Sequence, residues 1–327
     1  MSEIVTAVGT SHSPLLTLPG ELWMPYSARD RHNRDLYDET GTHTTFDELA
    51  VRNGDRYETL INEDHFAERS AACQRALDRL AAQLEAARPD VVVIVGDDQT
   101  ELFDSTIQPV IAIFHGDRFE MATGEQMPDN EIGNAMRDGY SMRPGTAFAS
   151  HRALAQRLIA GLLERDVDVA ASDGAPPGRG FGHAYGFVAR RLLSRLDVPI
   201  VPVLLNTYYP PNQPTPGRCY RIGQALGAAI NVAPDDVRVA LVASGGLSHF
   251  VVDPALDEIV LDAIVANDGA TLSSIAPVRL QAGSSEIRNW ITVAGAMAGR
   301  AVAWREYVPC VRSVAGTGMG MGFLAWS

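Results

Sequence analysis

Short runs of β-branched and other apolar residues recur along the chain, and most of them precede a stretch with helical spacing. The clearest run is Val91 to Val95, where five apolar residues follow one another without a polar interruption. Such runs are typical of strands that are buried on both faces of a parallel sheet. The stretch 64–88 instead places Leu77, Leu80 and Leu84 on one helical face. This alternation predicts an α/β fold with a largely parallel central sheet flanked by helices.

The other expected elements continue the same alternation over one domain, residues 1–327. Asp64 is the expected N-cap of the 64–88 helix, and Ser150 caps another helix that contains Leu154 and Leu158. Two long stretches, 18–62 and 116–150, show no clear period, and we interpret 18–62 as an insertion that covers a site and could contact another subunit. Strands are expected at 4–8, 109–114, 167–171, 200–205 and 237–242, and further helices after His183 and at about 218–230, 253–267 and 285–299.

The glycine-rich stretch from Gly316 to Gly322 does not follow a strand and open a helix with an acidic residue downstream. It therefore lacks the context of a dinucleotide-binding fingerprint. We interpret it as a turn or as a close-packed final strand.

Composition limits the partners and the compartment. The 327 residues carry a net charge of −13, which disfavours binding to a nucleic-acid backbone. Cys73, Cys219 and Cys310 are widely spaced and odd in number, so no disulfide framework is expected and a reducing cytoplasm fits best. We expect no signal peptide, because the first residues lack a basic region and a long apolar stretch. No apolar run approaches the ~18 residues that span a bilayer, so no membrane association is expected.

Polar residues follow several of the expected strands or the loops beside them. They are His12, the cluster Asp97–Glu101, His115, His183 and His249. Open α/β sheets bind ligands at the carboxyl ends of their strands. Each histidine alone has an ordinary structural explanation, but their recurrence favours a metal site or acid–base catalysis. No His-x-x-x-His or Glu-x-x-His spacing is present, so metal ligands would have to come from distant elements.

Three motifs resemble the class III, LigB-type extradiol ring-cleavage dioxygenases, whose type member is the catalytic subunit of protocatechuate 4,5-dioxygenase. They are Gly9-Thr10-Ser11-His12-Ser13-Pro14, Gly245-Gly246-Leu247-Ser248-His249, and Asn206-Thr207-Tyr208-Tyr209-Pro210-Pro211 with Arg218-Cys219. Their order and spacing match from residue 5 to beyond residue 290. The long 18–62 segment also resembles that of single-chain members acting on O-methylated gallates.

The resemblance implies one Fe(II) held by two histidines and a glutamate. The first histidine corresponds to His12. The glutamate lies four residues before a tryptophan, which corresponds to Glu286 before Trp290. Without the resemblance, Glu286 would be interpreted as a solvated carboxylate at a helix start.

The second family histidine follows an aspartate after the strand that ends at Val95, and this chain has Asp98-Gln99 there. A neutral amide is a poor iron ligand compared with imidazole. Gln99 could bind through its oxygen, Asp98 or Glu101 could replace it, or His43 or His65 could reach the metal. We rank the side chains of Asp98, Gln99 and Glu101 first. A site without iron is a further alternative.

The resemblance also implies two acid–base histidines, His183 and His249. Histidine suits this role because its pKa lies near neutrality. His249 is the expected base that helps to deprotonate the substrate, and His183 is the expected proton donor or hydrogen-bond partner during cleavage of the oxygen–oxygen bond. Asn206, Tyr208, Tyr209 and Arg218 are expected to bind substrate. Arg179 and Arg288 are alternatives for a substrate carboxylate, although surface ion pairs are the commoner role.

The implied function is Fe(II)-dependent extradiol cleavage of a catechol- or gallate-type ring with O2, in a cytoplasmic homo-oligomer. The alternative is a LigB-fold protein with an altered metal site, acting as a non-redox metal hydrolase or a binding protein. Gln99 is the residue that favours this alternative.

Overall fold

The computed structural model describes residues 1–234 and 236–327. In these residues, eight strands form one central sheet in the order β11-β12-β1-β10-β4-β9-β5-β8, which confirms the α/β prediction. β1, β10, β4 and β9 are parallel neighbours, whereas β12 runs antiparallel to β1 and β5 runs antiparallel to β9. The strands are β1 (Glu3–Thr10), β4 (Val91–Gly96), β5 (Ile111–Phe114), β8 (Ala170–Ser172), β9 (Ile200–Leu205), β10 (Arg238–Ser244), β11 (Val302–Val311) and β12 (Gly318–Trp326).

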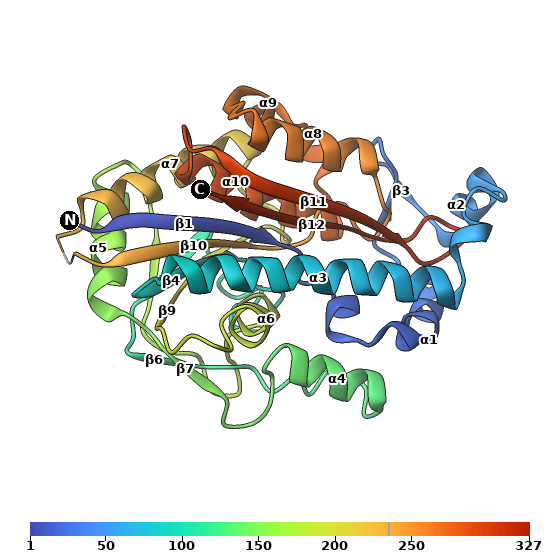
Figure 1. Ribbon diagram of the computed structural model, residues 1–327, viewed down its shortest axis with the longest axis horizontal. Helices are drawn as coiled ribbons and strands as arrows, with labels where there is room; N and C mark the ends of the chain where they lie inside the picture. The colour runs from blue at the N-terminus through green and yellow to red at the C-terminus, as the bar shows by residue number, and fades with distance from the viewer. Residues whose placement is uncertain (235) are drawn as a thin grey trace.

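Helices cover both faces of this sheet, so side chains that alternate along a strand enter two separate cores. Val91, Val93 and Val95 pack with α5, α7 and α10, while Val92 and Ile94 pack with α3 and α6. Figure 1 shows α3 crossing the sheet on one face, with α7, α8 and α9 along one side of the molecule. The helices are α1 (Trp23–Ser27), α2 (Phe46–Asn53), α3 (Glu63–Ala87), α4 (Glu131–Gly139), α5 (Arg152–Leu163), α6 (His183–Arg191), α7 (Pro216–Val232), α8 (Pro254–Val265), α9 (Gly269–Ser274) and α10 (Ile287–Ala296).

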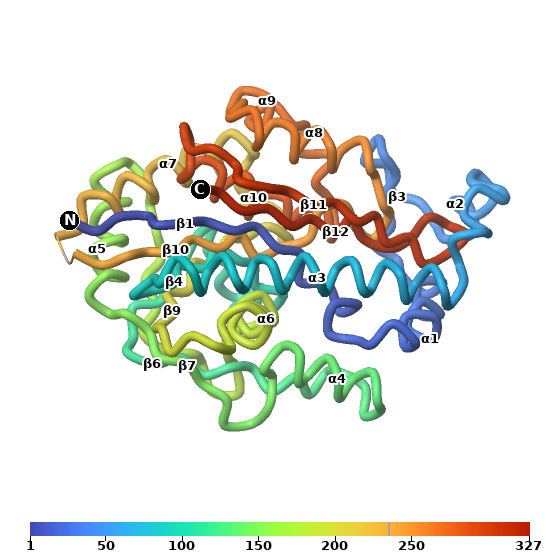
Figure 2. Tube along the Cα trace, in the orientation of Figure 1, coloured from blue at the N-terminus to red at the C-terminus, as the bar shows by residue number. Residues whose placement is uncertain are grey.

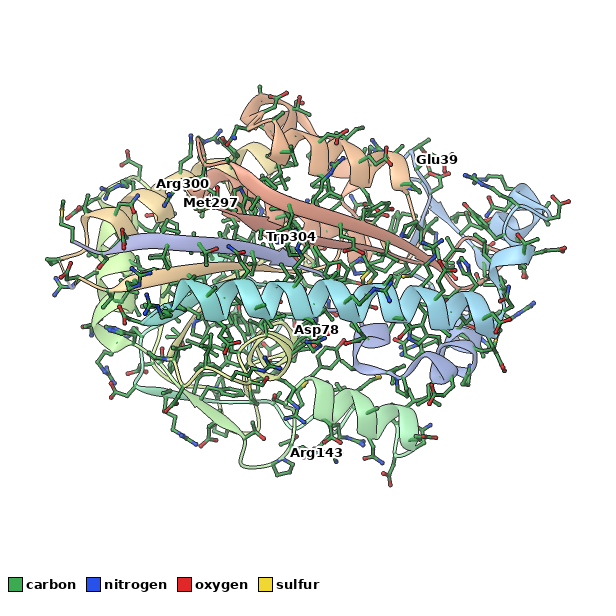
Figure 3. All side chains as sticks on the ribbon, in the orientation of Figure 1. Glu39, Asp78, Arg143, Met297, Arg300 and Trp304 are labelled. Carbon is green, nitrogen blue, oxygen red and sulfur yellow. The ribbon has the colours of Figure 1, made fainter. Side chains whose placement is uncertain are left out.

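No helix in residues 1–234 and 236–327 combines the length and apolar character that crossing a bilayer requires. The long helix α3 is amphipathic, and its outer face meets β11 as well as solvent. There the guanidinium of Arg79 lies 4.1 Å from the ring centre of Trp304, which is on β11 beside α3 (Figure 3).

Two helix starts differ from the predictions by one or two residues. Asn62, not Asp64, caps α3, because its side chain accepts a hydrogen bond from the backbone N–H of His65. His151, not Ser150, caps α5, since its Nδ1 accepts from the backbone N–H of Leu154. A histidine nitrogen can supply the acceptor that serine usually provides at this position.

The stretch 116–150 was expected to be irregular, but it contains regular elements. It contains the antiparallel strand pair β6 (Arg118–Glu120) and β7 (Ala147–Ala149) and, between these strands, the helix α4, which Asn130 caps. These elements are short, so their apolar periodicity is weak. The sequence pattern also did not predict β11.

The glycine-rich tail forms β12, which confirms the interpretation as a close-packed final strand. A Cβ on Gly320 would lie 1.9 Å from Oδ2 of Asp257, and one on Gly322 would lie 2.7 Å from Cδ1 of Leu247. Glycine therefore lets the loop after β10 and the start of α8 pack directly on β12. Figure 2 shows β1 between β12 and β10, so the two ends of the chain meet in the sheet.

The 18–62 segment is built from short pieces, including α1, α2 and the hairpin of β2 (Leu36–Tyr37) and β3 (His43–Thr44). A buried ion pair ties it to the end of β11: Arg312 donates two hydrogen bonds to Asp30, at 2.8 and 2.9 Å. Thr317 also donates to the Asp30 carboxylate, at 2.5 Å. Asp30 and Arg312 are both almost completely buried.

Replacing Asp30 with alanine should lower the free energy of unfolding by about 3–5 kcal/mol, because it leaves the buried Arg312 charge without its partner. Chemical denaturation measures this loss. The double variant Asp30→Ala/Arg312→Met removes both charges and should be less destabilised than Asp30→Ala. An equal loss in both variants would show that the ion pair is not the cause.

Candidate metal centre

The carboxyl ends of three parallel strands bring the motif residues together. Thr10 pairs with Ser244 across β1 and β10, and Ala243 pairs with Val95 across β10 and β4. The loops that follow these strands therefore open at one edge of the sheet, as expected for an α/β site. They contribute the residues His12, Gly245–His249 and Asp97–Glu101.

Four buried or half-buried side chains converge at this edge. Ligand-type atoms of His12, Asp97, His183 and Glu286 all lie within 4.8 Å of one another. Nε2 of His12 is 3.0 Å from Oε2 of Glu286 and 3.9 Å from Oδ1 of Asp97. Nε2 of His183 is 3.9 Å from Oδ2 of Asp97. Imidazole nitrogens and carboxylate oxygens around one point match the ligands of non-haem iron and related divalent metals.

The hydrogen bonds of His12 determine which ring nitrogen is free. Ser244 donates its hydroxyl proton to the carbonyl of Ala184 at 2.7 Å, so its oxygen accepts from Nδ1–H of His12 at 2.9 Å. In the neutral ring Nε2 then carries a lone pair, and this buried nitrogen has no hydrogen-bond partner among the described residues. Nε2 faces the carboxylate oxygen of Glu286. Both atoms carry lone pairs, so they repel each other unless a proton or a cation lies between them. The residues therefore fit a metal ion.

Glu286 comes from the turn that precedes α10. Its Oε2 accepts a hydrogen bond from the backbone N–H of Gly246, at 2.5 Å. Its Oε1 lies 3.4 Å from Nε2 of His249. Burial alone would raise the pKa of Glu286, but His12 and His249 hold that pKa well below its usual range. Glu286 is almost completely buried, so it is not the solvated helix-start carboxylate of the alternative interpretation.

The carboxylates outweigh the positive charge that surrounds them. Burial and the charge of Glu286 raise the pKa of Asp97 to about 6. Burial opposes protonation of His183 and His249, yet Glu101 raises the pKa of His183 to about 10 and Glu286 raises that of His249. The shifts of His183 and His249 report negative potential from the neighbouring carboxylates, which a divalent cation would also neutralise, whereas the shift of Asp97 comes mainly from burial.

The three candidates for the missing ligand have other partners. Gln99 donates its amide N–H groups to Oε1 of Glu286 at 3.0 Å and to Oδ2 of Asp97 at 3.2 Å. Asp98 accepts hydrogen bonds from the backbone N–H groups of Leu102 and Phe103. Glu101 meets Nδ1 of His183 at 2.5 Å. Asp98 and Glu101 are not part of the four-residue group. Ligation by Gln99, Asp98 or Glu101 stays a prediction.

His249 is held rigidly at the edge of the cluster. Its Nδ1 donates to the carbonyl of Leu247 at 2.8 Å, which leaves Nε2 to face Glu286. A Cβ on Gly283 would lie 1.9 Å from Cδ2 of His249, so only glycine accommodates the ring there. Nε2 is therefore the ring nitrogen that faces the cluster.

The cluster opens into a cavity of about 360 Å³. His12, His183, His249 and Glu286 form part of its wall, and Tyr26 and Arg29 of the 18–62 segment form another part. A second cavity of about 670 Å³ shares His249 and is lined by further residues of that segment, between 35 and 57. This position agrees with a covering role.

The residues predicted to bind substrate come from the loop after β9 and the first turn of α7. Asn206, Tyr208, Tyr209 and Arg218 are absent from the described linings of both cavities. Asn206 stabilises its own loop through Tyr209 and Asn212, and Arg218 donates to the carbonyl of Asp166. Their role in binding substrate stays a prediction.

The remaining candidates also lie outside the four-residue group, which contains none of His43, His65 and His115. Nε2 of His43 contacts the carbonyl of Arg34, and Arg69 donates to His65. Arg179 forms the expected ion pair, at 2.5 Å from Asp104.

Arg288 is buried, contrary to the expectation of a surface ion pair. It donates to the backbone carbonyls of Thr207, Pro214, Leu280 and Ser285. It thereby joins the loop after β9 to the turn that carries Glu286.

Sequence reasoning gave no individual role to Asp97, Ser244 or Asn289. Asp97 is completely buried and directly follows β4. Asn289, which lies about one helical turn after Glu286, donates a hydrogen bond to Asp97 at 3.3 Å. Asp97 belongs to the acidic cluster seen in the sequence. Its position directly after a strand that is buried on both faces could have predicted that it is buried. Nothing in the sequence pairs Ser244 with His12.

Asp257 fixes the residue next to His249. It accepts hydrogen bonds from the backbone N–H and the hydroxyl of Ser248 and from the hydroxyl of Tyr307, each at 2.7 Å. Burial raises the pKa of Asp257 to about 6, although these hydrogen bonds oppose the shift.

A pH-dependent stability follows from Asp257. The carboxyl of Asp257 binds its proton more tightly in the folded protein than in the unfolded chain. The contribution of this proton to the free energy of unfolding is therefore complete below pH 4 and is lost as the pH rises through about 6. Relative to Asp257→Asn, the wild type should lose up to ~3 kcal/mol of unfolding free energy between pH 4 and 7. Denaturation across this range measures the difference, with the exposed Glu258→Gln as the control. Parallel curves for wild type and Asp257→Asn would contradict the assignment.

The fold and the site define a class of α/β proteins that present a histidine–carboxylate cluster able to hold a metal ion at the carboxyl edge of the sheet. The chain belongs to the LigB family, described as the catalytic LigB subunit of aromatic ring-opening dioxygenase, whose family model matches residues 62–321. It is also 29% identical over 195 residues to a gallate dioxygenase of Pseudomonas putida. That match covers 54% of this chain and 55% of the relative, so the chain spans about half the length of the relative.

Proposed function

We propose that the protein is an Fe(II)-dependent extradiol dioxygenase that cleaves a catechol- or gallate-type ring with O2. The observation that carries this proposal is the free Nε2 of His12, aimed at Glu286 in the wall of the cavity. Family membership and the similarity to a gallate dioxygenase support it. The three cysteines are free and buried, which supports a cytoplasmic protein. A homo-oligomer and a single domain are parts of the same proposal.

In this mechanism His12 and Glu286 would hold the metal, which would bind the ring oxygens and O2 and pass electron density between them. The chain supplies the proton chemistry. His249 takes a hydroxyl proton from the substrate at Nε2, because Nδ1 is committed to the carbonyl of Leu247. Glu286, 3.4 Å away, stabilises the imidazolium that results. Tyr26 and Arg29 cover the cavity and limit its access to water.

The test is anaerobic purification, measurement of bound iron, and oxygen uptake with gallate, 3-O-methylgallate and protocatechuate. We expect uptake of one O2 per ring opened with at least one of these substrates. Absence of uptake across a broad catechol panel, with iron bound, would exclude ring cleavage.

Gln99 favours a second candidate, a non-redox metal hydrolase or a binding protein. Its amide N–H groups face Glu286 and Asp97, where the family has an imidazole. The iron-loaded protein would then bind a catechol without consuming oxygen, a result that distinguishes the two functions.

A further inference from the structure

We propose that His183 supplies the second imidazole of the metal site, so that the metal is held by His12, His183 and Glu286. This replaces the proton-donor role that the family resemblance gave to His183. The proposal rests on the metal requirement of the proposed function but not on ring cleavage.

The position of His183 carries the first part of this inference. Its ring centre lies 4.7 Å from that of His12, with the two rings edge to face. A ring nitrogen of His183 belongs to the same group of atoms within 4.8 Å as a nitrogen of His12 and the oxygens of Glu286 and Asp97, and its Nε2 lies 3.9 Å from Oδ2 of Asp97. One ion at the centre of this group is within reach of both imidazoles without any movement of the backbone.

The tautomer of His183 carries the second part. Nδ1 lies 2.5 Å from Oε1 of Glu101, so the carboxylate accepts the Nδ1 proton and Nε2 is directed to the cluster. A carboxylate behind a histidine in this way is typical of metal-binding histidines. His12 uses the same arrangement, with Ser244 behind its Nδ1. Both rings therefore offer Nε2 to one point.

Gly182 makes room for this orienting carboxylate. A Cβ at position 182 would lie 2.5 Å from Cδ of Glu101. Glu101 also accepts from the backbone N–H of Gln99 at 2.5 Å, which joins the loop after β4 to the start of α6. The loop that lacks the family histidine thus positions its replacement.

Gln99 then has a positioning role. Its amide donates to Glu286 and to Asp97 and leaves Oε2 of Glu286 facing His12. The NH2 group of the Gln99 amide faces the cluster, and an amide NH2 group has no lone pair to donate to a cation. The donor set becomes two imidazoles and one carboxylate, the facial arrangement that leaves positions open for ligands.

The experiment uses apo-protein prepared anaerobically and titrated with Fe(II) or Co(II). Calorimetry gives the dissociation constant, and pulsed EPR of the NO adduct of the Fe(II) protein, with ¹⁵N-labelled histidine, counts the bound imidazoles. The variants are His183→Ala, His249→Ala, Gln99→Ala and Gln99→His/His183→Ala, with the exposed His32→Ala as the matched control. Circular dichroism checks that each variant is folded.

We expect two bound imidazoles in the wild type and one in His183→Ala. The metal affinity of His183→Ala should fall by at least ~100-fold, because loss of a residue that only supports a ligand already costs up to about 100-fold. Gln99→Ala should keep two imidazoles and lose less than ~10-fold. The double variant, with a histidine at the family position, should recover affinity and the second imidazole.

One imidazole in the wild type, unchanged affinity in His183→Ala, or no metal binding by the wild type would overturn the proposal. If His183→Ala does not fold, the count in His249→Ala decides the matter: it should stay at two, and a fall to one would make His249 the second imidazole and overturn the proposal. Two imidazoles without oxygen uptake would instead leave the ligand assignment standing and exclude the dioxygenase function.

Discussion

Replacing Glu286 with glutamine is expected to reduce oxygen uptake with the best substrate by at least ~1,000-fold, which corresponds to several kcal/mol of lost stabilisation by the metal. Glu286 is the anion nearest to Nε2 of His12, at 3.0 Å. Glutamine has the same shape and can still accept from the backbone of Gly246, so the local fold should be retained. The neutral amide removes the negative charge that balances a divalent cation.

Bound iron and oxygen uptake should therefore fall together in Glu286→Gln. Glu258→Gln, an exposed position on α8, is the matched control and should keep both. Full turnover and full iron content in Glu286→Gln would show that this carboxylate is not a ligand.

Replacing His249 with alanine should lower turnover by about 100- to 10,000-fold, the range typical of a lost general acid or base. The bound iron should be unchanged, because His249 is not among the four clustered residues. Steady-state oxygen uptake and metal analysis on the same preparation separate the two effects. Loss of iron together with activity would make His249 a ligand and contradict the base assignment.

The variant Gly283→Ala tests the same residue without removing the imidazole. The new methyl group would lie 1.9 Å from Cδ2 and 2.3 Å from Nε2 of His249, so the ring has to move. Turnover should fall towards that of His249→Ala while iron is retained. Gly174→Ala is the matched control, because the methyl group added there would have no heavy atom within 4 Å beyond its own chain neighbours.

The central sheet was predictable because its strands are continuous apolar runs buried on both faces. β4 shows this directly, with Val91 to Val95 dividing between two cores. The strand pair β6–β7 and helix α4 were missed because their apolar positions are few and their stability depends on contacts distant in the chain. β11 was also missed. It is an edge strand in which half-buried and exposed residues alternate at the start, so it has no continuous apolar run.

Part of the metal centre was predictable from motifs that place His12, Glu286 and His249. The orientation of each ring was not. It depends on hydrogen bonds between residues far apart in sequence, such as Ser244 with His12 and Glu101 with His183. The sequence pattern pointed to residue 99 as the position in doubt, but only the three-dimensional contacts show which neighbouring imidazole is close enough to compensate.

The place of β1 in the sheet has a consequence for biosynthesis. β1 carries the strand end before His12, and it lies between β10 and β12, which are synthesised more than 200 residues later. On the ribosome, β1 therefore waits with both edges unpaired until nearly the whole catalytic region has emerged. The cluster of His12, Asp97, His183 and Glu286 is therefore one of the last features to form, and incomplete chains would not hold the proposed iron.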